Sequence, residues 1–169
     1  FKGEAGRGIP KGNGTDTITE KVQSFSLEGF SESGEKIWQI EGKSADIYSD
    51  VINLTDINAD SYSKDIRANL RSDKGIFYRN SNNVELKENV VLVTSDGSRL
   101  TTQSLSWNEK EEQISTQDHV YIEHSDMDAE GIGALALPNL KKAQLNKDVK
   151  VKIKKPKAVI TCDGPLEID

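Results

Sequence analysis

The chain has 169 residues, of which 34% are hydrophobic and 30% are charged, and its formal net charge is −6. This length is typical of one domain, the low apolar content disfavours a many-layered interior, and the acidic balance disfavours general nucleic-acid binding. The single cysteine, Cys162, excludes an intrachain disulfide and a cysteine-based metal cluster.

The N-terminal part of the chain changes from a loop-like composition to strand-like alternation. Residues 1–16 contain five glycines and one proline and are predicted to form a flexible leader. From Thr17 onward apolar and polar residues alternate, and the runs 25–29 and 37–42 are separated by a glycine-bearing turn. This pattern predicts a β-hairpin, and similar short runs continue as far as Tyr78.

A strand-like sequence motif, which we call the repeat phrase, then recurs about every thirty residues. It lies at 84–92, 114–122 and 143–151, with a looser copy at 52–59. A unit of this length cannot bury its own apolar face, so the copies must stack on one another. Each of the three full copies carries a polar pair at the same place, and such a pair predicts a bulge or corner where the strand bends. These pairs are Glu88-Asn89, Asp118-His119 and Lys147-Asp148. The repeat therefore predicts an elongated, all-β architecture.

Residues that often perform catalysis or bind metals show no recognisable arrangement. The two histidines, His119 and His124, lie among carboxylates, but His119 occupies the turn position that Asn89 and Asp148 fill in other repeats. A solvated turn therefore explains this histidine better than a metal site does. Carboxylate pairs fall mostly at turns and on polar strand faces, and neither a Gly-x-Ser-x-Gly elbow nor a phosphate-binding loop is present. We expect no enzyme activity, no metal site and no cofactor.

The two faces of the later strands differ in chemistry. Lys150, Lys152 and Lys154 alternate with apolar residues. They are interpreted as a solvated face that discourages aggregation, with contact to phosphate or acidic groups of a partner as the alternative. The apolar face would ordinarily be core, yet the low apolar content leaves little to pack opposite it. That shortage leaves room for an apolar ligand.

We expect this protein to contact a membrane only through a segment that precedes the given sequence. No apolar stretch approaches the length of a membrane-spanning helix, which is about eighteen residues or more. The sequence begins at Phe1 without a methionine, so we expect a signal or an anchor to precede it.

Several of these segments are similar to one protein family. Phe25-Ser-Leu27-x-Gly29, followed by Gly34-x-x-x-Trp38-x-Ile40-x-Gly42-x-x-Ala45, resembles the N-terminal signature of the LptC family of lipopolysaccharide-export proteins. The segments 86–90 and 97–102 resemble the LptA/OstA-like repeats that share its fold. The resemblance covers about residues 22–160.

The resemblance implies an antiparallel, half-open β-jellyroll whose apolar trough takes the acyl chains of lipid A. It implies a periplasmic domain, held at the inner membrane by an N-terminal helix. Its sheet edges would pair with the inner-membrane lipopolysaccharide ABC transporter on one side and with an LptA-type periplasmic protein on the other. We therefore expect one jellyroll domain at 17–162, with 163–169 as a tail or the start of a further repeat. That tail leaves LptA-like or fused variants open.

These expectations assign residues to two kinds of site. The trough lining is predicted to comprise Phe25, Leu27, Trp38, Ile40, Leu54, Ala59, Leu70, Leu86, Val90, Leu92, Trp107, Val120, Ile122, Leu145, Val149 and Val151. The partner-binding edges are predicted to include Phe25, Gly29, Gly131, Lys150 and Lys152. Which face of each strand turns inward is not fixed by alternation, because a bulge reverses the phase.

Three functions are compatible with this pattern. The first is lipopolysaccharide transport across the periplasm, with the domain acting as a passive conduit. The second is a structural β-solenoid or adhesin-type module whose apolar face is only core. The third is a carbohydrate-active β-protein, for which Trp38 and Trp107 would supply aromatic surfaces.

Overall fold

The computed structural model describes residues 18–62, 65, 67–137 and 142–168, and within these residues it contains strands and turns but no helix. The predicted leader, residues 1–16, lies outside the described residues. The strands are β1 (Glu20–Phe30), β2 (Lys36–Ile47), β3 (Val51–Tyr62), β4 (Arg67–Tyr78), β5 (Asn83–Thr94), β6 (Arg99–Asn108), β7 (Gln113–Glu123), β8 (Met127–Leu137), β9 (Lys142–Lys154), β10 (Lys157–Cys162) and β11 (Leu166–Ile168).

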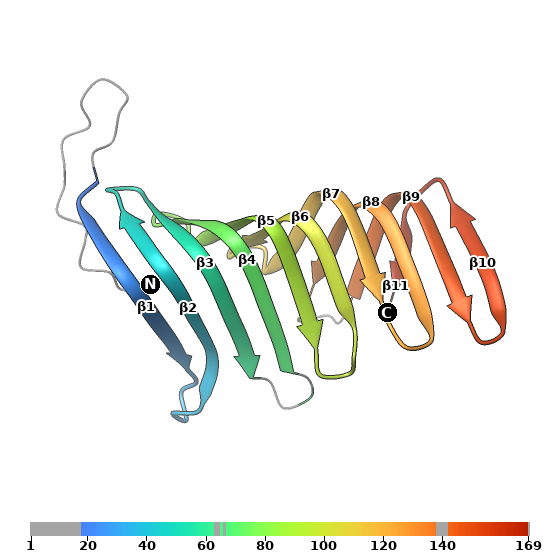
Figure 1. The fold of residues 1–169 in the computed structure, drawn as a ribbon, viewed down its shortest axis with the longest axis horizontal. Helices are drawn as coiled ribbons and strands as arrows, with labels where there is room; N and C mark the ends of the chain where they lie inside the picture. The colour runs from blue at the N-terminus through green and yellow to red at the C-terminus, as the bar shows by residue number, and fades with distance from the viewer. Residues whose placement is uncertain (1–17, 63–64, 66, 138–141, 169) are drawn as a thin grey trace, which may run out of the picture.

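All eleven strands belong to one antiparallel sheet with the simplest possible order. Each strand from β1 to β9 pairs with the next one along the chain, and β11 pairs with β9. The strands lie side by side along the long axis, with β1 at one end and β10 at the other (Figure 1). The sheet stays open because its two end strands do not meet. This confirms the predicted all-β, antiparallel, half-open architecture.

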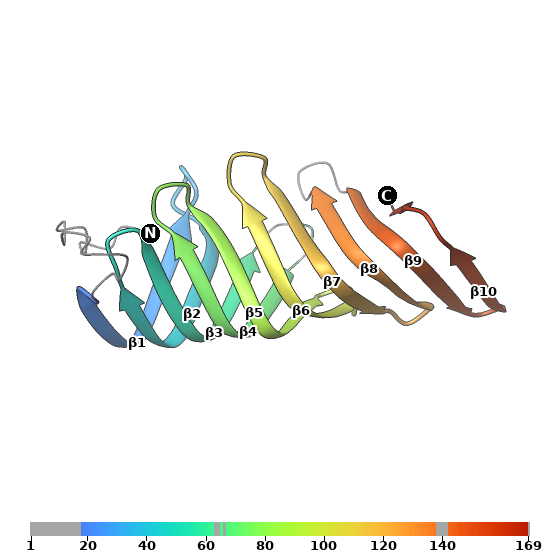
Figure 2. The ribbon, with the colours of Figure 1, turned by 90° about the horizontal axis from the view of Figure 1, so that it is seen from above.

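Each long strand bends near its middle, so that the sheet folds over itself (Figure 2). Positive φ angles mark the bend at Glu88 (66°) and Asn89 (52°) in β5, and at Asp148 (49°) in β9. The pairing register also breaks between Lys87 and Val90, and between Thr116 and His119. Short polar residues tolerate this left-handed backbone better than β-branched ones. The predicted corner at the polar pairs is therefore confirmed.

The bends divide the sheet into two facing layers, which we call layer A and layer B. Layer A contains the segments 43–55, 74–87, 104–116, 134–137 and 142–146. Layer B contains the segments 25–41, 57–62, 67–71, 90–102, 120–130 and 149–154.

The apolar interior between the layers forms two clusters, one in each half of the sheet. The N-terminal core comprises Phe25, Ala45, Ile47, Ile52, Leu54, Ile57, Leu86, Val90 and Leu105. The C-terminal core comprises Val120, Ala129, Leu145, Val149 and Val151. All of these side chains are at most 9% exposed.

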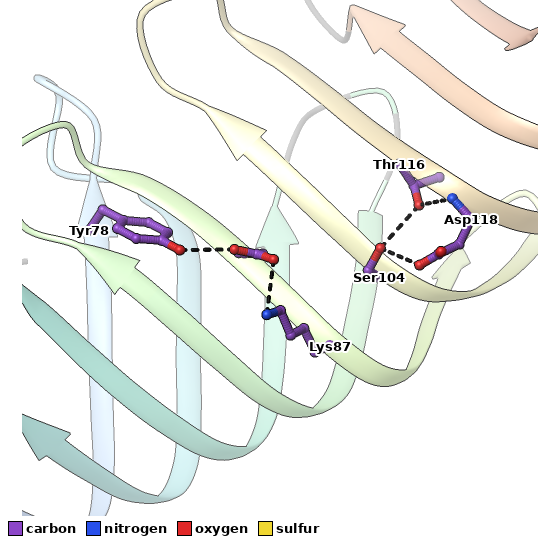
Figure 3. Close-up of polar contacts among 6 residues, drawn as sticks. Tyr78, Lys87, Ser104, Thr116 and Asp118 are labelled. Atoms are coloured by element: carbon purple, nitrogen blue, oxygen red, sulfur yellow. Dashed lines mark hydrogen bonds and ion pairs between the residues drawn. The ribbon is translucent and has the colours of Figure 1, made fainter.

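Buried polar groups separate the two cores where β6 and β7 bend. Thr102 and Thr116 are 6% and 4% exposed. Ser104 lies 3.3 Å from Thr116 (Oγ to Oγ1) and donates a hydrogen bond to Asp118 at 2.5 Å (Figure 3). No Cα pairing joins β6 and β7 between Thr101 and Ser106. The interior is therefore interrupted at its midpoint.

The C-terminal residues complete the last bent strand. β10 pairs with residues 149–154 of β9, and β11 pairs with residues 143–145 of the same strand. Residues 163–165 therefore lie at the bend, and β10 and β11 take the places of the two halves of one strand. Leu166 packs against the C-terminal core.

Candidate ligand cavity between the two layers

A cavity of about 520 Å³ lies between the layers in the N-terminal half of the sheet. All of its lining residues are apolar except Asn82, Ser106 and Glu109. A volume of this size falls within the range of small-molecule sites, which is roughly 300–1,000 Å³. Its lining is Leu27, Trp38, Ile40, Leu54, Ile57, Ala59, Leu70, Phe77, Asn82, Val84, Leu86, Leu105, Ser106, Trp107, Glu109 and Ile114.

Cross-strand rows of inward side chains build the two walls. In layer A one row runs Phe77–Val84–Trp107–Ile114 across β4 to β7. In layer B the matching row runs Leu27–Ile40–Ala59–Leu70 across β1 to β4. Because every second residue of a strand points to the same face, these rows present continuous apolar surfaces to each other.

The glycines of the family-like signature make room for two aromatic rings. Gly29 pairs with Trp38, and a Cβ on Gly29 would lie 2.2 Å from the Trp38 indole. Gly42 pairs with Phe25 in the same way, and its Cβ would lie 2.2 Å from the Phe25 ring. The absence of these Cβ atoms lets each ring lie across the neighbouring strand. Trp38 thereby reaches the cavity wall, and Phe25 fills the N-terminal core.

A polar rim borders the cavity at the tips of two hairpins. These tips are the β4–β5 turn, which contains Asn82, and the β6–β7 turn, which contains Glu109. The indole Nε1 of Trp107 donates a hydrogen bond to Glu109 Oε2 at 2.7 Å. The backbone N–H of Glu109 donates to Asn83 Oδ1 at 3.0 Å and ties the two tips together. An apolar ligand group would therefore meet hydrogen-bonding groups as it leaves the cavity at this rim.

The structure brings together half of the sixteen residues predicted to line the trough. Those in the cavity wall are Leu27, Trp38, Ile40, Leu54, Ala59, Leu70, Leu86 and Trp107. Phe25 and Val90 are buried in the N-terminal core, and Leu92 is half-buried in layer B. The remaining five belong to the C-terminal core or pack against it, namely Val120, Ile122, Leu145, Val149 and Val151.

Eight wall residues were not among those predicted from the sequence. Val84 and Ile114 each begin a repeat phrase, so the repeat itself held the signal for them. Ile57 lies in the looser copy of the repeat at 52–59, whereas Phe77 and Leu105 lie outside the repeated segments. Asn82, Ser106 and Glu109 are polar and were not candidates for an apolar trough.

The predicted partner edges are partly corrected. Phe25 and Gly29 lie in β1, which is an end strand of the sheet. Gly131 lies in β8, which pairs with both β7 and β9, so it is not at an edge. Lys150 and Lys152 are exposed but lie in β9, one strand inside the end of the sheet, because β10 pairs beyond them. The outermost strands are therefore β1 and the β10–β11 pair.

His119 takes part in local contacts on the outside of the bend. Its Nε2 lies 3.6 Å from Glu130 Oε2, and its ring makes an edge contact with Tyr121 at a centroid distance of 4.2 Å. Among the described residues no group of three or more histidine, cysteine, aspartate or glutamate side chains is arranged to hold a metal ion.

Comparison with known proteins connects this fold to one family. In the part of the chain that the structure describes, no helix has the length and apolarity needed to cross a membrane. No curated protein matches the sequence. A family model described as lipopolysaccharide-assembly, LptC-related, matches residues 8–154. This is a transport family associated with the inner membrane and the periplasm, and its work is lipopolysaccharide transport. The match spans most of the chain, which therefore belongs to the LptC family.

Proposed function

We propose that this domain holds acyl chains of lipid A in the N-terminal cavity during lipopolysaccharide transport. The observation that carries this proposal is the cavity itself, which is about 520 Å³ in volume and apolar on both walls. Burial of acyl chains stabilises the complex by roughly 0.8 kcal/mol for each CH₂ group. The polar saccharide stays outside the layers, where it keeps its hydration.

Passage along the domain needs no bond to be made or broken. The walls offer no specific anchor for a chain, so binding depends on contact area and remains reversible. The energy for directional movement comes from the ATPase of an inner-membrane ABC exporter. The domain is thus a conduit and not an enzyme.

The two ends of the sheet supply the partner surfaces in this proposal. β1 at one end and β10–β11 at the other carry backbone N–H and C=O groups that an added strand can pair with. One end would join the ABC exporter and the other an LptA-type periplasmic protein. An anchor helix outside the given sequence would hold the domain at the periplasmic face of the inner membrane.

Photocrosslinking to lipopolysaccharide tests the cavity assignment. We place the reactive side chain at Leu70, which lines the cavity, or at its exposed neighbour Arg71. Lipopolysaccharide should be labelled from position 70 and not from position 71, because successive residues of a strand face opposite sides. Labelling at neither position in a folded sample would refute lipid binding and favour a structural β-module with an apolar core.

A further inference from the structure

A second depression lies on the outer face of layer A, directly behind the cavity wall. This outer groove has a volume of about 320 Å³. Its polar lining includes Tyr78, Asn83, Glu85, Asn108, Gln113 and Ser115. The outer groove also shares three lining residues with the cavity, namely Val84, Ser106 and Trp107.

Strand register explains why the two sites are neighbours. The inner row Val84–Trp107–Ile114 lines the cavity, and the outer row Glu85–Ser106–Ser115 lines the groove. The two rows are one residue apart along the same three strands. At the hairpin tip, Asn82 borders the cavity while Ser81 and Asn83 border the groove. A ligand can therefore pass from one site to the other over the tips of the β4–β5 and β6–β7 hairpins.

The chemistry of the outer groove suits hydroxyl groups better than phosphate. Its lining combines hydroxyl and amide side chains, which both donate and accept hydrogen bonds, with one carboxylate and no cation. Glu85 accepts a hydrogen bond from Tyr78 Oη at 2.9 Å, and Lys87 Nζ lies 3.2 Å from its other oxygen (Figure 3). Lys87 is thus paired with Glu85, and a phosphate in the groove would face that carboxylate. A saccharide hydroxyl, which donates and accepts, matches this lining.

We propose that the outer groove binds saccharide hydroxyls and that a glycolipid lies across the hairpin tips, with acyl chain in the cavity and sugar in the groove. The acyl-chain part rests on the proposed function, whereas the saccharide part rests on the groove alone. The same hydroxyl chemistry is offered by a lipid headgroup and by a free saccharide, so the test separates these two sources.

The test compares two pairs of alanine substitutions on the outer face of layer A. The groove variant is Gln113→Ala with Ser115→Ala, and the control variant is Asn53→Ala with Thr55→Ala, which are exposed on β3 outside the groove. Each protein is titrated with palmitate, which probes the cavity alone, and with lipid A, which probes both sites. The deacylated saccharide of lipid A, followed by amide chemical shifts of residues 113 and 115, probes the groove alone.

The groove variant should bind lipid A about tenfold more weakly, the effect expected for two lost neutral hydrogen bonds, while its palmitate affinity stays unchanged. The control variant should match the unaltered protein with both ligands. Unchanged lipid A affinity in the groove variant would overturn the proposal. So would an equal loss of palmitate affinity, because that would show a structural role.

Failure of the proposed function gives a different result. If the unaltered protein binds neither palmitate nor lipid A, the cavity assignment is refuted. Binding at the groove is then tested with the free saccharide alone. Chemical-shift changes at residues 113 and 115 that the groove variant abolishes would assign the groove to a free saccharide. No change at these residues would overturn the groove as well.

Discussion

The two halves of the sheet use the same bent strand, yet they differ in what lies between their layers. In the N-terminal half large inward side chains, including Trp38, Leu70, Phe77 and Trp107, surround a cavity. In the C-terminal half the core residues are at most 6% exposed, and β8 to β11 contribute no residue to the cavity wall. The same fold therefore holds an open site at one end and a closed core at the other.

The two halves also differ in the side chains at several inward positions. In the C-terminal half Ala129 is a core residue, Ala134 packs against the same core, and Gly131 is buried at the bend of β8. At the bend of β8, a Cβ on Gly131 would lie 3.3 Å from the backbone oxygen of Lys147 in the paired strand β9, so the bend leaves little room for a larger residue. In the N-terminal half the aromatic rings of Trp38, Phe77 and Trp107 line the cavity. Under the proposed function, an acyl chain would travel on toward β10 only if the layers of the C-terminal core separated.

Matched leucine deletions should reveal this contrast most strongly. Leu145→Ala removes a side chain that is 2% exposed in the C-terminal core and should lower the free energy of unfolding by about 3 kcal/mol. Leu70→Ala removes a half-buried side chain that already borders empty space, so it should cost about 1 kcal/mol. Urea denaturation of both variants measures the difference. Equal losses would mean that the two halves are packed to the same density.

Enlarging matched alanines reverses the test. Ala129→Leu forces extra volume into a position that is 4% exposed and should destabilise the fold by about 2 kcal/mol. Ala59→Leu extends into the cavity and should leave the free energy of unfolding within about 0.5 kcal/mol of the original while weakening palmitate binding. Thermal unfolding and palmitate titration report the two effects. Loss of stability in both variants would show that the cavity is not available space.

The architecture followed from the sequence because its signals are local. The repeat of strand and polar pair predicted the bends at Glu88-Asn89 and Lys147-Asp148, and the backbone there adopts positive φ. The aromatic and glycine positions of the signature indicated the family, and the pairing of Gly29 with Trp38 gives them a physical reason. Short polar residues and glycines mark such places in any sequence.

The site was only half predictable because the distance between layers depends on residues far apart in the chain. Val90 and Val120 occupy the same position in two copies of the repeat, and both are fully buried. The repeat alone therefore does not show which copy lies near a cavity and which lies in a closed core. Thr116 occupies an inward position with a polar side chain and interrupts the apolar phase. Lys150 and Lys152 were predicted to lie at a sheet edge. Their side chains are exposed, but they lie one strand inside the end of the sheet because β10 pairs with their strand.

The Gly29–Trp38 pair offers a smaller test of how the open half is built. Gly29→Ala places a methyl group where the indole now lies, so Trp38 must move and the fold should lose roughly 1 kcal/mol. Gly164→Ala is the matched control at the opposite end of the sheet, because a Cβ there meets no atom within 4 Å. Tryptophan fluorescence should change in the first variant and stay constant in the second. An unchanged spectrum and stability for Gly29→Ala would show that the glycine is not needed to seat the ring.

The smallest expected effect concerns Tyr78, whose ring borders the outer groove in the open half. Its hydrogen bond to Glu85 raises the pKa of the phenol above its ordinary value of 10.0, and burial and the Glu85 charge act in the same direction. A raised pKa in the folded state means that this contribution to stability is fully present below about pH 10 and is lost as the pH rises through the folded pKa. Glu85→Gln should therefore lower the pKa of Tyr78, and the tyrosinate absorbance, compared with that of Tyr78→Phe, measures the change. A titration that Glu85→Gln leaves unaltered would mean that this hydrogen bond does not hold the phenol in solution.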